Sequence, residues 1–217
     1  ADTFESYQIY GFKYNSSSDQ LSIDISGLEV QSTNPGINSV FNLNNSDYKL
    51  KLGSVETDEY FHNGDIAEIL VFNTSLSESE ENHINYYLSK KWGLESSMDS
   101  DGDGYSDNSE EVAGASPIDS LEYPETDLSD TIDAKIGESS GLDAIESNLK
   151  LWLDASNIDF ESNVTLSDGD AISEWKDLSG NDYHAQQASA SNQPTIKLND
   201  LNSNATVSFT SSSSHYM

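Results

Sequence analysis

A twelve-residue segment at 99–110 constrains this chain more than any other stretch. It reads Asp-Ser-Asp-Gly-Asp-Gly-Tyr-Ser-Asp-Asn-Ser-Glu and fills every defined position of the pattern D-x-[DN]-x-[DN]-G-x5-E. Carboxylates at alternating positions of a tight loop can supply the six to eight oxygens that Ca²⁺ prefers, and Gly104 permits the sharp turn. The segment therefore predicts a calcium site. Its predicted ligands are the side chains of Asp99, Asp101, Asp103, Asp107 and Glu110 and the main-chain carbonyl of Tyr105.

Two alternatives to a calcium loop exist for this segment. An acidic linker rich in Ser and Gly would merely stay solvated, but five constraints met within twelve consecutive positions favour a metal loop. Mg²⁺ suits the loop less well, because it demands a small octahedral shell and keeps several waters. Within the loop, Asp107 is expected to bind the ion either directly or through a water.

The charge of the chain excludes some classes of partner. Thirty-nine acidic residues face nine lysines and no arginine, which gives a formal net charge of −30. Nucleic-acid binding needs a basic surface that releases phosphate counterions, and anionic lipid surfaces repel an acidic chain. No stretch approaches the length of a membrane span, so neither nucleic-acid binding nor membrane insertion is expected.

The composition favours an extracellular location. The chain has no cysteine, so neither disulfides nor a thiol active site is available. Abundant Ser, Asn, Asp, Gly and Tyr are typical of an all-β surface protein, and a strongly acidic chain suits a salty, calcium-containing fluid that screens its self-repulsion. Because the first residue is Ala, we expect the chain to be processed or cut from a longer one.

Apolar periodicity predicts several strands and one helix. The predicted strands are 7–14, 21–25, 28–30, 48–53 and the apolar run after the turn signal Asn63-Gly64. Ser77 and Glu80 form a capping-box pattern, an apolar stripe follows, and Gly93 suits the end of a helix. The helix is therefore predicted at about 77–92. Residues 122–140 are rich in acids and are predicted to be an extended linker.

Two parts of the chain resemble opposite ends of laminin-G-like, concanavalin A-type jelly-roll domains. The run Gly-Asp-Ile-Ala-Glu-Ile-Leu-Val-Phe-Asn at 64–73, followed by Tyr-Leu-Ser-Lys-Lys-Trp-Gly-Leu at 87–94, resembles the C-terminal end of that family. Leu-Trp-Leu-Asp-Ala at 151–155, Trp-x-Asp-x-Ser-Gly-Asn at 175–181 and Gln-Pro-Thr at 193–195 resemble its N-terminal opening. The tail of one such domain thus precedes the head of another.

The calcium segment and the residues after it resemble a thrombospondin type 3-like motif. Glu-Glu-Val-Ala-Gly-Ala-Ser-Pro-Ile-Asp at 110–119 matches the E-x-x-x-G-T-x-P-x-D tail of that motif, with Ala115-Ser116 as a departure. The resemblance implies a place between domains of a long secreted bacterial protein, where the ion stiffens the connection.

Together these features predict an all-β fold of concanavalin A-like jelly-roll β-sandwich halves, with one short helix at about 77–92 and an EF-hand-like calcium loop in the linker. The predicted divisions are 1–93 as the C-terminal part of a laminin-G-like sandwich, 94–148 as the calcium motif and acidic linker, and 149–217 as the N-terminal part of a sandwich. Each half would leave unpaired strand edges. The halves are expected to pair either within one chain or between neighbouring copies.

The function expected from this pattern is structural and adhesive rather than enzymatic. We expect an extracellular calcium-binding repeat unit whose partners are neighbouring copies of itself, in an array or filament. The first alternative is a calcium-dependent, lectin-like module that binds glycans. A glycan-processing enzyme is less favoured, because no Glu-x-Asp-x-x-Glu run is present and Asp65 and Glu68 fall on opposite faces of a strand. Trp92, Trp152 and Trp175 are expected in the core rather than stacked on sugars.

Overall fold

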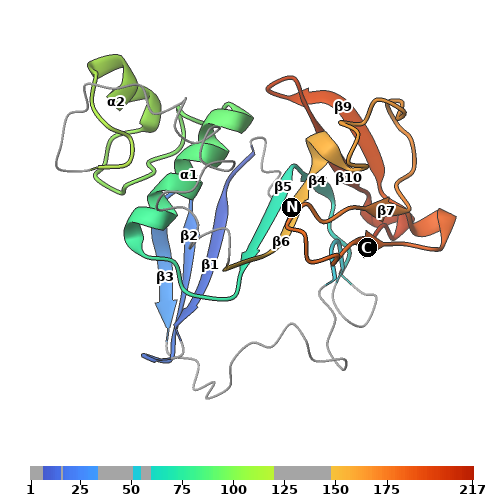
Figure 1. Cartoon of the computed structure of the whole chain (residues 1–217), viewed down its shortest axis with the longest axis horizontal. Helices are drawn as coiled ribbons and strands as arrows, with labels where there is room; N and C mark the ends of the chain where they lie inside the picture. The colour runs from blue at the N-terminus through green and yellow to red at the C-terminus, as the bar shows by residue number, and fades with distance from the viewer. Residues whose placement is uncertain (1–6, 16, 34–50, 55–59, 120–147) are drawn as a thin grey trace. The chain divides into compact units, whose positions relative to one another are not determined.

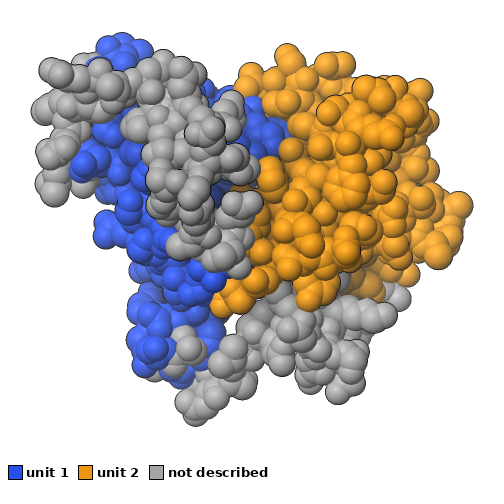
Figure 2. Space-filling view, viewed as in Figure 1, with its two compact units in different colours: residues 1–40, 74–148 blue, residues 41–73, 149–217 orange. Residues whose placement is uncertain are grey.

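The computed structural model describes residues 7–15, 17–33, 51–54, 60–119 and 148–217 (Figure 1). The chain divides into two compact units, each discontinuous in sequence (Figure 2). Unit 1 comprises residues 1–40 and 74–148, and unit 2 comprises residues 41–73 and 149–217. The predicted linker at 122–140 and most of the predicted strand at 48–53 lie outside the described residues. No helix within the described ranges has both the length and the apolar character of a membrane span.

Unit 1 contains a three-stranded antiparallel sheet. Its strands are β1 (Tyr10–Asn15), β2 (Gln20–Ile25) and β3 (Leu28–Thr33), in that order. Phe12 lies opposite Ile23, so the alternation of the strands places apolar side chains of β1 and β2 on one face. The turn between β2 and β3 contains Gly27, whose φ of 86° suits glycine and strains a residue with a side chain. These strands agree with the ones that the apolar alternation predicts.

Unit 1 also contains two helices, α1 (Glu78–Trp92) and α2 (Asp107–Ala113). The capping box predicted for α1 is present: the Ser77 side chain accepts from the Glu80 N–H, and the Glu80 side chain accepts from the Ser77 N–H. Gly93 ends α1 in the left-handed conformation, as predicted. The shorter α2 is not among the predicted elements.

Unit 2 consists of small antiparallel sheets. Its strands are β4 (Gly64–Ile66), β5 (Glu68–Phe72), β6 (Leu149–Asp154), β7 (Glu174–Trp175), β8 (Ala185–Gln186), β9 (Thr195–Leu201) and β10 (Asn204–Phe209). They form the sheets β4-β10-β9, β5-β6 and β7-β8. Three short 3-10 helices, η1 (Ala155–Asn157), η2 (Ala190–Asn192) and η3 (Ser211–Ser213), lie between or after these strands.

The strand pairs of unit 2 join distant parts of the same chain. In the β5-β6 pair, Ile69 lies opposite Leu153. In the β4-β10 pair, Ile66 lies opposite Val207. Residues before the segment 99–110 therefore pair with residues after it within one chain, which is one of the two arrangements that the sequence leaves open.

One hydrophobic core holds unit 2 together. Its buried members are Leu52, Leu151, Leu153, Ala155, Ile158, Ile172, Trp175, Ile196, Ala205, Val207, Phe209 and Met217. Trp175 is 0 % exposed, and its indole N–H donates to the Asp154 carbonyl at 3.1 Å. In unit 1, Trp92 is buried as well. Trp152 is half-buried and donates its indole N–H to Glu68 Oε1 at 2.7 Å. The core assignment is thus confirmed for Trp92 and Trp175.

The described residues form a mixed fold in which strands dominate. Most regular structure lies in small antiparallel sheets, as predicted, but α1 and α2 make the fold mixed rather than all-β. The reason for α2 is local. The Ser106 side chain accepts from the Ser109 N–H at the start of α2, and Gly114 ends it in the left-handed conformation. The two caps stabilise a short helix where a loop and its acidic tail were expected.

Candidate metal centre

Three carboxylates converge in the loop between α1 and α2. Asp99, Asp101 and Asp103 each offer one oxygen, and these oxygens lie within 4.8 Å of one another. Oxygens that bind one Ca²⁺-sized cation at about 2.3–2.6 Å are separated by at most about 5 Å. The cluster of Asp99, Asp101 and Asp103, called the aspartate cluster below, could therefore hold a metal ion.

Hydrogen bonds from main-chain amides hold the aspartate cluster in place. Asp99 Oδ1 accepts from the Gly102 N–H at 2.8 Å, and its Oδ2 accepts from the Gly104 N–H at 2.9 Å. Asp103 Oδ1 accepts from the Tyr105 N–H at 2.9 Å. Gly104 has a φ of 101° with open space around it, so the backbone conformation, not crowding, explains the glycine. Carboxylate oxygens carry two lone pairs each, so these bonds leave acceptor capacity for a cation.

Two buried carboxylate oxygens have no hydrogen-bond partner among the described residues, Oε2 of Glu110 and Oδ2 of Asp101. Glu110 is only 4 % exposed. Burial, followed by the negative charges of the aspartate cluster and Asp107, raises the pKa of Glu110 to about 8. Burial is also the main cause that raises the pKa of Asp101 to about 6. A buried carboxylate oxygen without a partner is unfavourable, and a cation bound next to it would supply that partner.

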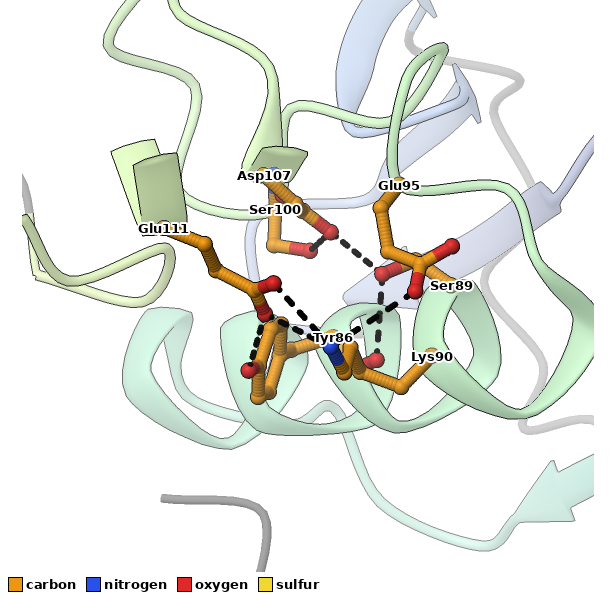
Figure 3. Close-up of polar contacts among 7 residues, drawn as sticks. All are labelled: Tyr86, Ser89, Lys90, Glu95, Ser100, Asp107 and Glu111. Carbon is orange, nitrogen blue, oxygen red and sulfur yellow. Dashed lines mark hydrogen bonds and ion pairs between the residues drawn. The ribbon is translucent and has the colours of Figure 1, made fainter. Parts of the chain in front are cut away.

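Asp107 links the loop to α1. It is 0 % exposed, and its Oδ1 accepts from the Ser100 N–H at 2.8 Å. Its Oδ2 accepts from the Ser100 hydroxyl at 2.9 Å and from the Ser89 hydroxyl of α1 (Figure 3). The carboxylate of Asp107 is thus engaged by two serines. Its role as a metal ligand stays a prediction.

A second set of contacts joins α2 to α1. Glu111 of α2 accepts a hydrogen bond from the Tyr86 hydroxyl at 2.6 Å (Figure 3). Its carboxylate also forms an ion pair with Lys90 at 2.9 Å, and Lys90 lies 3.6 Å from Glu95. The two elements that flank the loop are therefore held to each other by side chains outside the aspartate cluster.

The predicted ligands fall into three groups that differ in their surroundings and contacts. The three members of the aspartate cluster lie together, and Glu110 lies within the electrostatic reach of their charges. Tyr105 stays in the same turn through its N–H, while its ring is exposed, in keeping with a ligand role for its carbonyl rather than its side chain. Asp107 is directed to serine hydroxyls.

Sequence reasoning missed three residues that support the loop. Ser89 and Ser100 bind Asp107, and Gly27 lies against the main chain of Asp99. Ser100 occupies an unconstrained position of the loop pattern, and Ser89 is one serine within a helix, so neither carries a local signal. Gly27 interrupts a run of alternating residues, which marks a turn but does not indicate what lies next to it.

Acidic and histidine side chains outside the loop make structural contacts. Asp65 forms an ion pair with Lys197, and Glu68 accepts the Trp152 indole N–H. His184 accepts the Asp177 N–H at its Nδ1, and His215 accepts the Thr210 N–H at its Nδ1. The Nδ1 of His83 lies 2.6 Å from the Ser79 carbonyl. The ring of His62 packs against that of Phe209. Asp177 also accepts from the N–H groups of Trp152, Ser179 and Tyr183, which fits a turn-capping role.

Comparisons of the chain with protein-family models, with curated proteins and with solved structures find no match. The resemblance to laminin-G-like and thrombospondin type 3-like domains therefore stays a prediction. A function for the chain has to rest on its loop, its sheets and its composition.

Proposed function

We propose that this chain is an extracellular, calcium-binding structural and adhesive repeat unit. The observation that carries the proposal is the buried Glu110 carboxylate, whose Oε2 has no hydrogen-bond partner among the described residues, together with the aspartate cluster. Four acidic groups in one loop repel each other strongly unless a cation is bound. A resident ion explains why such an arrangement is compatible with a folded chain.

Calcium fits this ligand set better than magnesium. The proposed ligands are the aspartate cluster, Glu110 and the Tyr105 carbonyl, with Asp107 acting through a water because its carboxylate is engaged by serines. Ca²⁺ accepts a flexible shell of six to eight oxygens, whereas Mg²⁺ requires a compact octahedron. The ion would neutralise the loop and hold its turns rigid.

The proposal includes two further points. The chain contains parts of jelly-roll β-sandwich domains, and neighbouring copies of it assemble into an array. The β4-β10 and β5-β6 pairs support closure of unit 2 within one chain. Contacts between copies would then be made by the sheet of unit 1. In that sheet β3 is exposed along its whole length, and among the described strands it pairs only with β2. An exposed strand edge is a template for pairing with another chain.

An extracellular location and a non-enzymatic role belong to the same proposal. A formal charge of −30 suits a fluid rich in salt and calcium, where screening relieves self-repulsion. The absence of a Glu-x-Asp-x-x-Glu run from the sequence removes the main support for glycan hydrolysis. The ion would accordingly serve structure rather than chemistry.

A calcium-dependent carbohydrate-binding module is the second candidate. The observation that favours it is a pair of exposed aromatic side chains on one face of β1, Tyr10 and Phe12, the latter 71 % exposed. Aromatic rings present an apolar face on which a sugar can stack. A glycan array probed with calcium and with chelator separates the two candidates, because only the lectin-like module would give glycan signals that calcium increases and Phe12→Ala removes.

The structural proposal is tested by the size and shape of the purified chain. Sedimentation and small-angle scattering, in millimolar calcium and in EDTA, are expected to show calcium-dependent oligomers or fibres. A compact monomer of the same size and shape in both conditions would reject the linking role. Calorimetry on the same samples establishes calcium binding separately from assembly.

Calcium affinity is expected to rise with pH between about 6 and 8. The raised pKa values of Asp101 and Glu110, about 6 and about 8, mean that protons compete with the ion, so affinity changes by up to about tenfold per pH unit. Titration calorimetry in two buffers of different ionisation enthalpy is expected to show release of about one proton at neutral pH. Affinity that is constant across this range would contradict the prediction.

The same two carboxyl groups link pH to the stability of the ion-free chain. Their folded pKa values lie above the ordinary 3.8 and 4.5, so their ionisation opposes folding. The two groups make their full contribution to the free energy of unfolding when the pH is below their ordinary pKa values. This contribution is lost as pH rises through about 6 for Asp101 and about 8 for Glu110. The melting temperature of the EDTA-treated chain should therefore fall as the pH rises over this range. In calcium the melting temperature should not fall.

A further inference from the structure

The buried side chains of the two units differ in kind. The core of unit 2 is a cluster of apolar residues. In unit 1, the buried apolar residues among those described are Tyr86, Trp92, Met98 and Pro117. The buried polar residues there include Ser89, Asp99, Ser100, Asp107 and Glu110, which all belong to the loop or bind it. Much of the interior of unit 1 is therefore the surroundings of the candidate metal centre rather than a hydrophobic core.

The β2-β3 turn lies directly against this loop. The Asp99 N–H donates to the Ser26 carbonyl at 3.4 Å. A Cβ at Gly27 would lie 1.7 Å from the Asp99 carbonyl oxygen, far inside any contact distance, and 3.5 Å from the buried Met98. Only glycine allows the turn and the first predicted ligand to approach this closely. The sheet of unit 1 is thus joined to the main chain of the loop at Asp99.

Helix α1 is held to the loop from its C-terminal half. The segment just after α1 is tied to the start of α2, because the Asp107 N–H donates to the Met98 carbonyl at 2.8 Å and the Asn108 N–H donates to the Glu95 carbonyl at 3.0 Å. The Ser89 hydroxyl donates to the Asp107 carboxylate, so the interior face of α1 contacts the loop directly. Anything that fixes the loop therefore also fixes α1.

We propose that ion binding at the aspartate cluster and Glu110 controls the tertiary structure of unit 1, and that Gly27 and Ser89 are positioning residues of the site. With the ion bound, the loop holds the β2-β3 turn and α1 in place. Without it, repulsion among the carboxylates opens the loop, and β1–β3 and α1 lose their common anchor. Unit 2, with its apolar core, stays folded in both states. This inference rests on the proposed calcium binding.

Hydrogen–deuterium exchange of the full chain tests the inference, with calcium and with EDTA. Calcium is expected to slow exchange by at least about 100-fold in peptides from β1–β3 and α1, as well as from the loop, and to leave peptides from β6, β9 and β10 unchanged. Protection confined to 99–113 would overturn the inference while leaving calcium binding intact. Failure of the chain to bind calcium by calorimetry would instead overturn the proposed function on which it rests.

Two variants test the positioning residues, each with a matched control. Gly27→Ala is expected to weaken calcium binding by about tenfold or more, since residues outside the ligand shell commonly change affinity by this amount. Gly169→Ala is its control, because Gly169 has the same φ of 86° with nothing within 4 Å of an added Cβ. Equal affinities for the two glycine variants would exclude a role for the β2-β3 turn.

Ser89→Ala, which removes the hydroxyl that binds Asp107, is expected to weaken calcium binding several-fold. Its control is Ser97→Ala, because the exposed Ser97 hydroxyl bonds only to the Leu94 carbonyl. If Ser89→Ala binds calcium as tightly as the control, α1 is not coupled to the site. Calcium-dependent exchange of α1 peptides in the same variants gives a readout that a purely structural role of Ser89 would not change.

Discussion

Glu110→Gln is expected to weaken calcium binding by about 100-fold or more, which corresponds to about 2.7 kcal/mol of binding free energy. Glu110 occupies the last position of the loop, where a glutamate closes the calcium shell with two oxygens. The amide keeps the size of the side chain but removes one charge and one strong acceptor. Titration calorimetry with calcium measures the loss directly.

The same variant is expected to have the opposite effect on the ion-free chain. Burial and neighbouring negative charges raise the pKa of Glu110 to about 8. Ionisation of this side chain at higher pH therefore destabilises the folded, ion-free chain relative to the unfolded chain. Glutamine cannot ionise, and Glu110→Gln should therefore melt higher than the unmodified chain in EDTA above about pH 8, but lower in calcium. Such a crossover is hard to obtain from general damage to the fold.

Glu29→Gln provides the control for this substitution. Glu29 is an exposed residue of β3 in the same unit, so its replacement also removes one negative charge. Calcium affinity of this variant should stay within about twofold of the original, because the charge of an exposed side chain is screened by water and salt. If Glu110→Gln and Glu29→Gln bind calcium equally, Glu110 is not a ligand.

The elements that sequence predicted best are those whose signals are local. Helix α1 is defined by Ser77, Glu80 and Gly93, and all three make the contacts that their types predict. In unit 1, β2 follows from the alternation of Leu21, Ile23 and Ile25 with polar residues, and β1 follows from a run rich in aromatic residues. Each signal lies within a few residues of the structure that it specifies, so no knowledge of the rest of the chain is needed.

The strand partners in unit 2 required information that the sequence does not carry locally. β5 pairs with β6 and β4 pairs with β10, although the candidate metal loop lies between the members of each pair in the sequence. An apolar run predicts a strand but does not specify its partner. The sequence therefore left pairing within one chain and pairing between copies open, and the pairs in unit 2 are of the first kind.

In the candidate metal centre, too, some features have a local sequence signal and others depend on residues distant in the sequence. The ligand types, the turn at Gly104 and the closing Glu110 follow from twelve consecutive positions. The behaviour of Asp107 does not, because its carboxylate accepts a hydrogen bond from Ser89, which lies 18 residues earlier in α1. Likewise, Gly27 supports Asp99 from a turn far earlier in the chain. Ligand patterns predict which groups can bind an ion, whereas tertiary contacts decide which of them are free to do so.

Trp175→Ala is expected to lower the free energy of unfolding of unit 2 by about 3–5 kcal/mol. The side chain is 0 % exposed and packs in the apolar core with residues of β6, β9 and β10. Its removal leaves a cavity and also deprives the buried Asp154 carbonyl of the indole N–H. Denaturant unfolding in saturating calcium, followed by exchange of β9 and β10 peptides, measures the loss in unit 2 specifically.

Tyr60→Ala is the matched control, since Tyr60 is an aromatic residue of unit 2 that is 84 % exposed. Its loss should change stability by less than about 0.5 kcal/mol, as is usual for exposed positions. Calcium affinity should be unaffected by Trp175→Ala, because the core of unit 2 shares no residue with the metal loop. A loss below about 1 kcal/mol would mean that the indole is not packed in a core. Trp175 would then again become a candidate for stacking on a sugar.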